Sequence, residues 1–213
     1  PTVSLCLVVL KTVVGLASGS IAVLASAVDS LLDFVVSLFN AFAVRGAEKP
    51  RDENHNYGHG KIEGLAALFE GVLILGSAGY ILWKSVDKLL NPAPLEEAGI
   101  NLALVTMLIS MATAATLVWY LKRMSRLSRS LVLEADALHY RTDVWSNAAV
   151  LLGILAIRYT GWQAADALIA AAIGVYIAWA ALPLIRKGLN MLLDHALPDE
   201  LVNRILDVAR THS

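Results

Sequence analysis

Two acidic side chains, Asp29 and Asp33, lie near the middle of a long apolar stretch of the sequence. Because an α-helix turns about 100° and rises about 1.5 Å per residue, this spacing places both carboxylates on one helix face, about one turn apart. An acidic residue at the centre of a membrane-crossing helix costs roughly 2.5–3.5 kcal/mol in insertion experiments. Two such residues on one face therefore indicate a functional site that offers oxygen ligands to a cation.

A second pair, His139 and Asp143, repeats the same spacing in a later apolar stretch. Together the two pairs offer three carboxylates and one imidazole, which suits a tetrahedral divalent ion such as Zn²⁺, and the lack of a thiolate argues against a soft metal. Three carboxylates and one divalent ion sum to a charge of about −1, so removal of the metal should recruit protons to the same groups. The residues thus predict metal movement coupled to proton movement in the opposite direction.

A third group, Asp52, His55 and His59, lies in the link after the first acidic stretch, where two glycines make the backbone flexible. A loop can bring these three side chains around a second metal ion, and solvated loop histidines are the alternative. Lys61 and Asp194 lie at the ends of apolar stretches on the same predicted side of the membrane. They can form an ion pair, which at a surface contributes under about 1 kcal/mol.

Other polar residues interrupt the apolar stretches. Glu70 lies deep in one of them, either as a hydrogen-bonded polar group or as a second proton carrier, and the sequence leaves both open. Asp136 and Arg141 are compatible with an internal ion pair. A polar stripe shares the helix face of the two aspartates, and hydrogen bonding between helices is its simplest explanation. Its members are Ser26, Ser30, Ser37 and Asn40.

The elements that must position these groups are membrane-crossing helices. The chain has 213 residues, of which 57% are hydrophobic and only 16% charged, and its mean hydropathy is +0.63. These values predict an all-α membrane protein. Short links between the apolar stretches favour one compact six-transmembrane-helix bundle over residues 1–195. The predicted spans are Val3–Ser18, Ala22–Val44, Ile62–Trp83, Ala98–Leu121, Leu131–Tyr159 and Ala164–Ile185.

Basic residues set the predicted orientation. They concentrate in the links after the second and fourth spans and at the end of the sixth, so the positive-inside rule places these segments and both termini in the cytoplasm. A net charge of −1, with basic residues confined to short links, argues against a nucleic-acid partner. After the sixth span, Pro198–Ala209 has the pattern of a helix, and we expect residues 196–213 to begin a separate, truncated cytoplasmic domain.

The sequence resembles the cation diffusion facilitator family, and most closely its bacterial zinc and iron efflux branch. Four segments carry this resemblance: Ser26–Asp33, Asp52–Glu63, Glu134–Asp143 and Leu192–Asp199. The resemblance implies a homodimeric metal/proton antiporter with six transmembrane helices in the lipid bilayer of the bacterial inner membrane. It also implies a cytoplasmic αββα domain, of which only the first helix is present.

The resemblance also implies roles for individual residues. Asp29, Asp33, His139 and Asp143 correspond to the transport site; Asp52, His55 and His59 match the loop site; Lys61 and Asp194 match an inter-helix charge lock at the dimer interface. The expected function is export of Zn²⁺ in exchange for protons by alternating access, with Fe²⁺ and Cd²⁺ as open alternatives and no organic cofactor.

Two other classes of function compete with transport by an antiporter. An intramembrane zinc-dependent hydrolase needs an open coordination position and a general base, but here all four candidate ligands face the metal and no HExxH pair occurs. A passive channel needs an ion to leave quickly, which a four-ligand site opposes. The sequence therefore favours a transporter over an enzyme.

Overall fold

The computed structural model describes residues 2–18, 21–91, 100–162, 164–196 and 199–211 of the chain, apart from some side chains of α1, α2 and α4 and that of Asp199 in α7. This part of the chain is helical and contains no strand, as the sequence predicts. Its helices are α1 (Thr2–Ser18), α2 (Ile21–Ala47), α3 (Lys61–Leu90), α4 (Ile100–Ser128), α5 (Leu131–Thr160), α6 (Ala164–Leu192) and α7 (Asp199–Thr211).

Three helices extend about two turns beyond the predicted spans. Helix α3 continues to Leu90 rather than Trp83, α4 to Ser128 rather than Leu121, and α6 to Leu192 rather than Ile185. Hydropathy marks only the apolar part of a helix, whereas backbone hydrogen bonding continues through the polar residues of the membrane interface. At about 1.5 Å per residue, the 27–30 residues of α2 to α6 span about 40–45 Å, which matches a bilayer with its headgroup regions.

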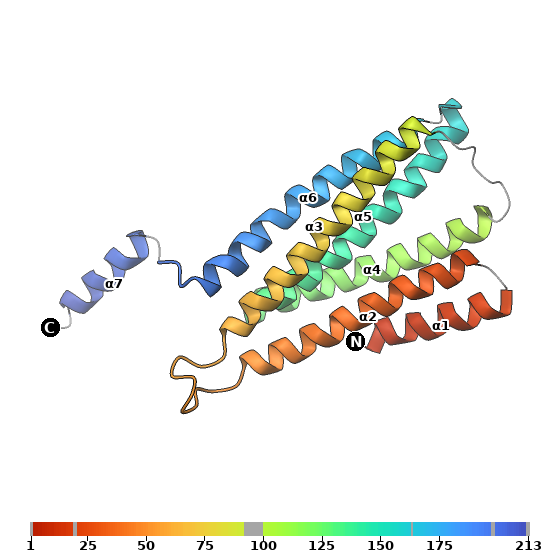
Figure 1. Ribbon diagram of the computed structural model, residues 1–213. Helices are drawn as coiled ribbons and strands as arrows, with labels where there is room; N and C mark the ends of the chain where they lie inside the picture. The colour runs from red at the N-terminus through yellow and green to blue at the C-terminus, as the bar shows by residue number, and fades with distance from the viewer. Residues whose placement is uncertain (1, 19–20, 92–99, 163, 197–198, 212–213) are drawn as a thin grey trace.

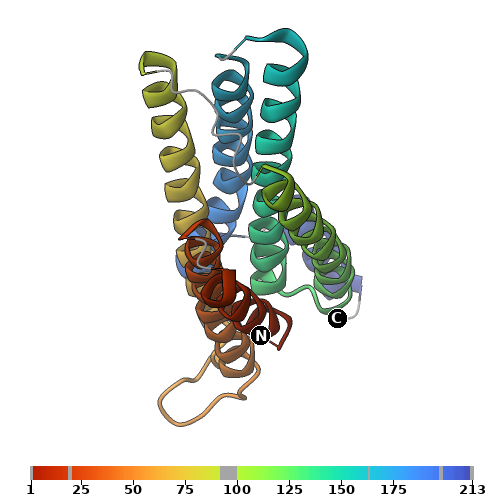
Figure 2. The same ribbon diagram turned by 90° about the vertical axis from the view of Figure 1, so that its right-hand side faces the viewer.

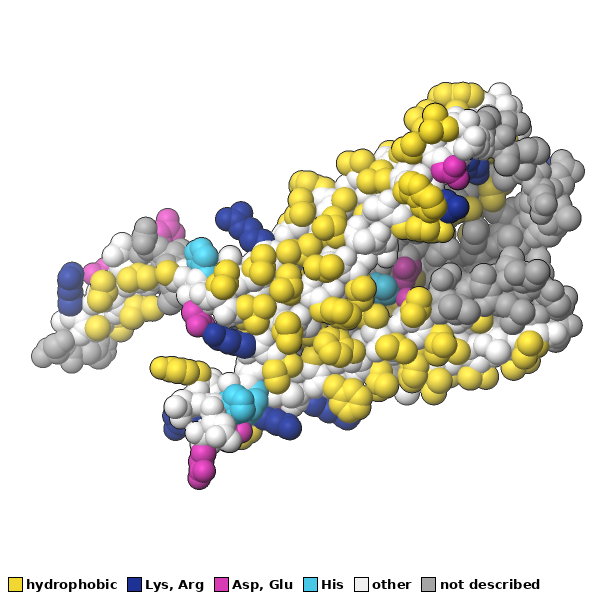
Figure 3. All heavy atoms as spheres, in the orientation of Figure 1, with side chains coloured by type: hydrophobic (Ala, Val, Ile, Leu, Met, Phe, Trp, Pro, Cys, Tyr) yellow, Lys and Arg dark blue, Asp and Glu magenta, His cyan; other side chains and the backbone are white. Residues whose placement is uncertain are grey.

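Apolar side chains cover much of the described surface on the face of the bundle shown in Figure 3. Phe42, Leu65 and Trp179 are each more than half exposed. Among the described residues, three segments are long and apolar enough to cross a membrane: Ser30–Ala47, Lys61–Leu90 and Ala164–Leu192. Large apolar side chains on the outer faces of such helices are favourable in contact with lipid or with another apolar surface, and unfavourable in water.

The bundle is built from helix pairs (Figures 1 and 2). Helix α3 packs most extensively on α6, α4 packs on α5, and α1 packs on α2, while α2 meets α3 and α5 over shorter stretches. The α3–α6 contact is close because glycines face each other: a Cβ atom on Gly188 would lie 2.8 Å from the carbonyl oxygen of Gly64. Helix α7 lies beyond the end of α6 (Figure 1).

Candidate metal centre

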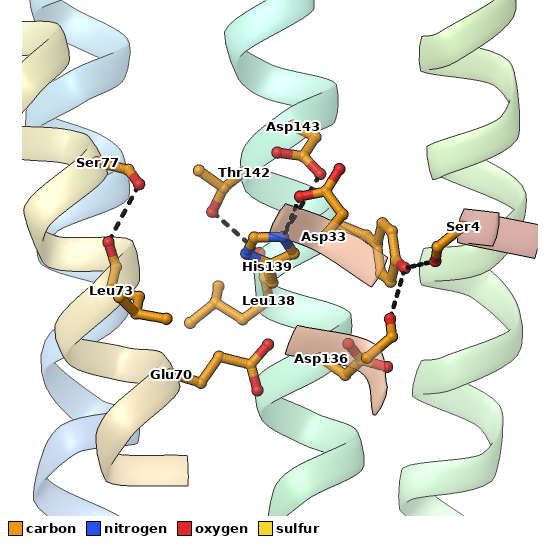
Figure 4. Close-up of polar contacts among 12 residues, drawn as sticks. Ser4, Asp33, Glu70, Leu73, Ser77, Asp136, Leu138, His139, Thr142 and Asp143 are labelled. Atoms are coloured by element: carbon orange, nitrogen blue, oxygen red, sulfur yellow. Dashed lines mark hydrogen bonds and ion pairs between the residues drawn. The ribbon is translucent and has the colours of Figure 1, made fainter. Parts of the chain in front are cut away.

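Three of the four predicted transport-site residues come together between α2 and α5 (Figure 4). Nε2 of His139 lies 3.0 Å from Oδ1 of Asp33 and 3.9 Å from Oδ2 of Asp143. Donor atoms that bind one Zn²⁺ at about 2.0–2.1 Å in a tetrahedron lie about 3.3 Å apart, which falls between these distances. Asp29 belongs to α2, but its side chain lies outside the described residues.

A buried tyrosine holds α5 against the first hairpin of the bundle. Tyr140, the neighbour of His139, shares hydrogen bonds with Ser4 Oγ of α1 at 2.9 Å and with Ser37 Oγ of α2 at 3.0 Å. All three side chains are buried. Because the phenol contacts two other helices, it sets the height of α5 relative to α2 and therefore the separation of the candidate ligands.

The beginning of α5 is fixed by an acidic cap from α3. The carboxylate of Glu63 accepts hydrogen bonds from Ser130 Oγ at 2.7 Å and from the backbone N–H of Leu131 at 3.0 Å. An anion at a helix N-terminus satisfies free N–H groups and interacts favourably with the helix dipole. The cap connects the loop end of α3 to the helix that carries His139 and Asp143.

The candidate ion pair of Asp136 with Arg141 is not the arrangement in the structure. Arg141 donates a hydrogen bond to Tyr176 Oη of α6 at 2.8 Å, while Asp136 accepts one from Asn40. Glu70 also accepts from Asn40, at 2.9 Å. The sequence predicts no hydrogen-bond partner for Glu70, and it marks Asn40 only as a member of the polar stripe.

The loop residues Asp52, His55 and His59 also form a compact cluster. Oδ1 of Asp52 lies 2.8 Å from Nδ1 of His55, and Oδ2 lies 3.5 Å from Nε2 of His59. The backbone N–H groups of Asn54 and His55 donate to the same carboxylate, and Gly58, with a φ of +79°, turns the chain. The hydrogen bond from the His55 side chain lowers the pKa of Asp52, and the two backbone hydrogen bonds add to this effect. Asp52 therefore stays ionised at neutral pH.

The predicted pair of Lys61 and Asp194 is present. Nζ of Lys61 lies 2.8 Å from Oδ2 of Asp194, and it also donates to the carbonyl of Leu192 at 3.4 Å. The pair connects the first residue of α3 to the segment that follows α6. Both side chains are more than half exposed, so the contact is a surface ion pair within one chain.

A cavity of about 620 Å³ lies between α4, α5 and α6, and its lining does not include Asp33, His139 or Asp143. Its lining includes Lys122, Arg126, Arg129 and Arg141, with Glu134 as the acidic member. Several positive charges around one cavity raise the energy of a cation inside it. This cavity is therefore a poor route for a metal ion to reach His139.

Sequence reasoning missed the contacts that cross between helices. Tyr140 with Ser4, Glu63 with Ser130, and Lys88 of α3 with Asp166 of α6 had no signal in local spacing. Among the sequence patterns, only the polar stripe indicated contacts between helices. Ser37 and Asn40 do form hydrogen bonds between helices, whereas the side chain of Ser26 lies outside the described residues.

These features define a class of protein: a multi-pass helical membrane protein with carboxylates and an imidazole gathered between two of its helices. The family model for the cation efflux transmembrane domain matches residues 2–193. The chain belongs to the cation diffusion facilitator family. Members of this family are transporters rather than enzymes, which excludes the hydrolase alternative, and the chain is a multi-pass protein of the bacterial inner membrane.

Curated relatives agree with this assignment. The chain is 39% identical over 191 residues to a cation-efflux pump, FieF, of Escherichia fergusonii, covering 90% of this chain and 63% of the relative. It is 41% identical over 202 residues to the cation-efflux pump FieF of Serratia proteamaculans, and the match covers 95% of this chain and 66% of the relative. It is 42% identical over 183 residues to the cation-efflux pump FieF of Klebsiella pneumoniae, and the match covers 86% of this chain and 60% of the relative. The chain therefore spans about two thirds or less of the length of these relatives.

Proposed function

We propose that this chain is the membrane part of a divalent metal cation/proton antiporter that exports Zn²⁺ from the cytoplasm. The observation that carries the proposal is the convergence of His139 with Asp33 and Asp143 at 3.0 and 3.9 Å, from two helices of the bundle. The relatives named as cation-efflux pumps support transport of a cation. Fe²⁺ and Cd²⁺ accept the same ligands and stay open as alternatives.

In this proposal α1 to α6 each cross the membrane, with both termini in the cytoplasm. This orientation is supported by the basic residues after α2, after α4 and at the end of α6, because basic residues concentrate on the cytoplasmic side of a membrane protein. Residues 1–195 form the transmembrane domain, and α7 begins a cytoplasmic domain of the αββα type. Asp29 completes the coordination as the fourth ligand, one helical turn before Asp33.

Coupling of protons to metal follows from the charge of the site. Three carboxylates and an imidazole held together repel one another unless a cation or protons are bound. A site emptied of metal therefore takes up protons, and a site filled with metal releases them. Because the same groups bind either cargo, metal and protons move in opposite directions.

Alternating access follows from the packing of the helices. The candidate ligands are divided between α2 and α5, which contact each other over a short stretch, whereas α3 and α6 pack closely along their length. Movement of α2 relative to α5 separates the ligands and releases the metal. In the present conformation the three side chains are 20–35% exposed, and histidine and acidic side chains can be seen between the helices in Figure 3.

The remaining sites have supporting roles in the proposal. Asp52, His55 and His59 bind a second metal ion at the cytoplasmic surface, where the 4.2 Å separation of the two imidazole rings allows both to face one ion. The Lys61–Asp194 pair holds α3 to the end of α6 near the interface with a second copy of the chain. The working unit is then a homodimer.

Transport into proteoliposomes tests this function. An acidic interior should drive uptake of external Zn²⁺, detected with a trapped fluorescent indicator, and collapse of the pH gradient should stop it. Asp33→Ala should lower the rate at least about 100-fold, because loss of a direct ligand exceeds the 10–100-fold cost of losing an outer-shell partner. Glu134→Gln, at an exposed ion pair with Lys187, is the matched control and should leave the rate unchanged. Uptake that ignores the pH gradient would exclude antiport.

A further inference from the structure

A second group of oxygen-bearing side chains lies between α2, α3 and α5, with Asn40 and Glu70 buried and Asp136 half-buried. The amide nitrogen of Asn40 donates to Oε2 of Glu70 at 2.9 Å and to Oδ1 of Asp136 at 3.4 Å. Glu70 is 1% exposed and Asn40 is 4% exposed. One amide thus holds two carboxylates together inside the bundle.

Two oxygen atoms of this group have no hydrogen-bond partner among the described residues: Oδ1 of Asn40 and Oε1 of Glu70. An unpaired buried polar atom costs about 1–3 kcal/mol, and more if it is charged. The ion pairs within the described part of the chain join other acidic residues to Lys or His. The group therefore combines two neighbouring carboxyl groups with free acceptor atoms, an arrangement that a bound cation would satisfy.

The position of the group relates it to the transport site. Asp136 precedes His139 by three residues on α5, and Asn40 follows Asp33 by seven residues on α2. At about 1.5 Å per residue, these offsets place the group roughly 5–10 Å nearer to the loop end of the bundle. Figure 4 shows Glu70 and Asp136 on one side of His139 and Asp143 on the other.

We propose that Asn40, Glu70 and Asp136 form a second site for a divalent cation, through which the metal passes between the cytoplasm and the transport site. The relay role rests on the proposed function, whereas binding of a cation at this group does not. Rotation of the Asn40 amide by 180° exchanges its nitrogen and oxygen, which are nearly equal in size. Without a cation, the Asn40 amide nitrogen donates to both carboxylates. With a cation bound, the rotated amide offers its oxygen as a third ligand.

The ligand set defines the class of ion and its affinity. Two carboxylates and an amide oxygen suit hard divalent ions such as Mn²⁺ and Mg²⁺, and they hold Zn²⁺ less tightly than a site that includes imidazole. Weaker binding suits a relay, because an ion must leave it for the next site. The basic cavity on another face of α5 repels cations, so the group between α2, α3 and α5 provides the route of lower electrostatic energy.

Binding of Mn²⁺ to the purified protein in detergent, followed by electron paramagnetic resonance, tests the proposal. The background variant combines Asp33→Ala, Asp143→Ala and Asp52→Ala, which removes ligands from both other candidate sites. We expect this background to bind about one Mn²⁺ per chain. Adding Glu70→Gln should weaken binding at least about 10-fold, whereas adding Glu134→Gln, a carboxylate on the same helix as Asp136 but at the surface, should not change it.

Three results would overturn the proposal. One is a background variant that keeps its helical circular dichroism and elutes as a single species but binds no Mn²⁺. Another is unchanged Mn²⁺ affinity after Glu70→Gln. The third is an infrared band of a protonated carboxyl group that disappears with Glu70→Gln and does not respond to Mn²⁺, because the group then holds a proton instead of a metal.

Zinc uptake by the unmodified protein separates this proposal from the proposed function. If Mn²⁺ binds in a Glu70-dependent manner while the unmodified protein shows no pH-driven zinc uptake, antiport is wrong and the cation site stands. If both hold, Glu70→Gln should slow zinc uptake several-fold without abolishing it, because the transport site retains its ligands. A Glu70→Gln protein that binds Mn²⁺ less tightly yet takes up zinc at the unmodified rate would refute the relay role.

Discussion

The two candidate metal clusters use the same side chains but are assembled in opposite ways. In the loop, Asp52, His55 and His59 lie within one short segment, and a turn brings them together. In the bundle, Asp33 and His139 are 106 residues apart, and they meet only because α2 packs against α5. Local chain geometry is enough for the first cluster, whereas the second depends on the packing of the whole bundle.

The surroundings of the two clusters differ as well. Asp52 and His55 are about half exposed, so water and salt screen their charges, whereas His139 is 20% exposed. Charges interact more strongly where water is scarce. We therefore expect the bundle cluster to control transport and the loop cluster to adjust it.

The sharpest test of this contrast exchanges one histidine in each cluster for alanine. His139→Ala should lower the rate of zinc uptake at least about 100-fold, because it removes a direct ligand of the transport site. His55→Ala should lower it at most about 3-fold at saturating zinc. Initial rates in proteoliposomes at matched protein content give both numbers. Equal losses in the two variants would break the comparison.

A change in helix packing should affect one cluster and spare the other. Gly188→Ala places a methyl group 2.8 Å from the carbonyl oxygen of Gly64, and overpacking of this kind costs about 1–3 kcal/mol. We expect a lower unfolding temperature and slower transport, with loop metal binding retained. Unfolding in detergent is followed by circular dichroism.

Gly76→Ala is the matched control for this packing test. A Cβ atom on Gly76 meets no atom within 4 Å, and alanine in a helix interior is favoured over glycine by about 0.5–1 kcal/mol. The unfolding temperature should therefore stay equal or rise. A similar loss of stability in both glycine variants would mean that the α3–α6 contact is not responsible.

The pH dependence of the loop follows from the lowered pKa of Asp52. Its contact with His55 stabilises the folded loop above the ordinary aspartate pKa of about 3.9 and is lost as the pH falls through the lower folded value. Carboxyl ¹³C chemical shifts of Asp52 measure this pKa. His55→Ala should move it back up, and an unchanged value would show that the hydrogen bond is not its cause.

The smallest effect is expected at the surface pair of Lys61 and Asp194. An exposed ion pair contributes about 0–1 kcal/mol, so Lys61→Ala should shift the unfolding temperature by only a few degrees. If the pair acts at a dimer interface, the fraction of dimer should fall as well. The double exchange Lys61→Asp with Asp194→Lys should restore it, as measured by analytical ultracentrifugation. A dimer fraction that never changes would show that this pair does not stabilise the dimer.

Much of the fold could be predicted from the sequence because helices in a membrane obey local rules. Apolar stretches of sufficient length predicted α1 to α6, and the i, i+4 spacing of His139 and Asp143 placed both on one face of α5. The loop cluster followed from residue types within eight positions. Helices α3, α4 and α6 continue beyond the predicted spans at one end, because hydropathy does not register the polar turns at the membrane surface.

Only the tertiary structure decided which helix faces meet. Nothing in the local sequence predicts that Glu70 shares Asn40 with Asp136, that Tyr140 contacts Ser4 and Ser37, or that Glu63 caps α5. The physical reason is that spacing along one helix fixes the relative positions of its own side chains, whereas contacts between helices depend on every packed surface in the bundle. The sequence by itself determined the candidate ligands; the packing of α2, α3 and α5 determined their distances and the buried oxygen group beside them.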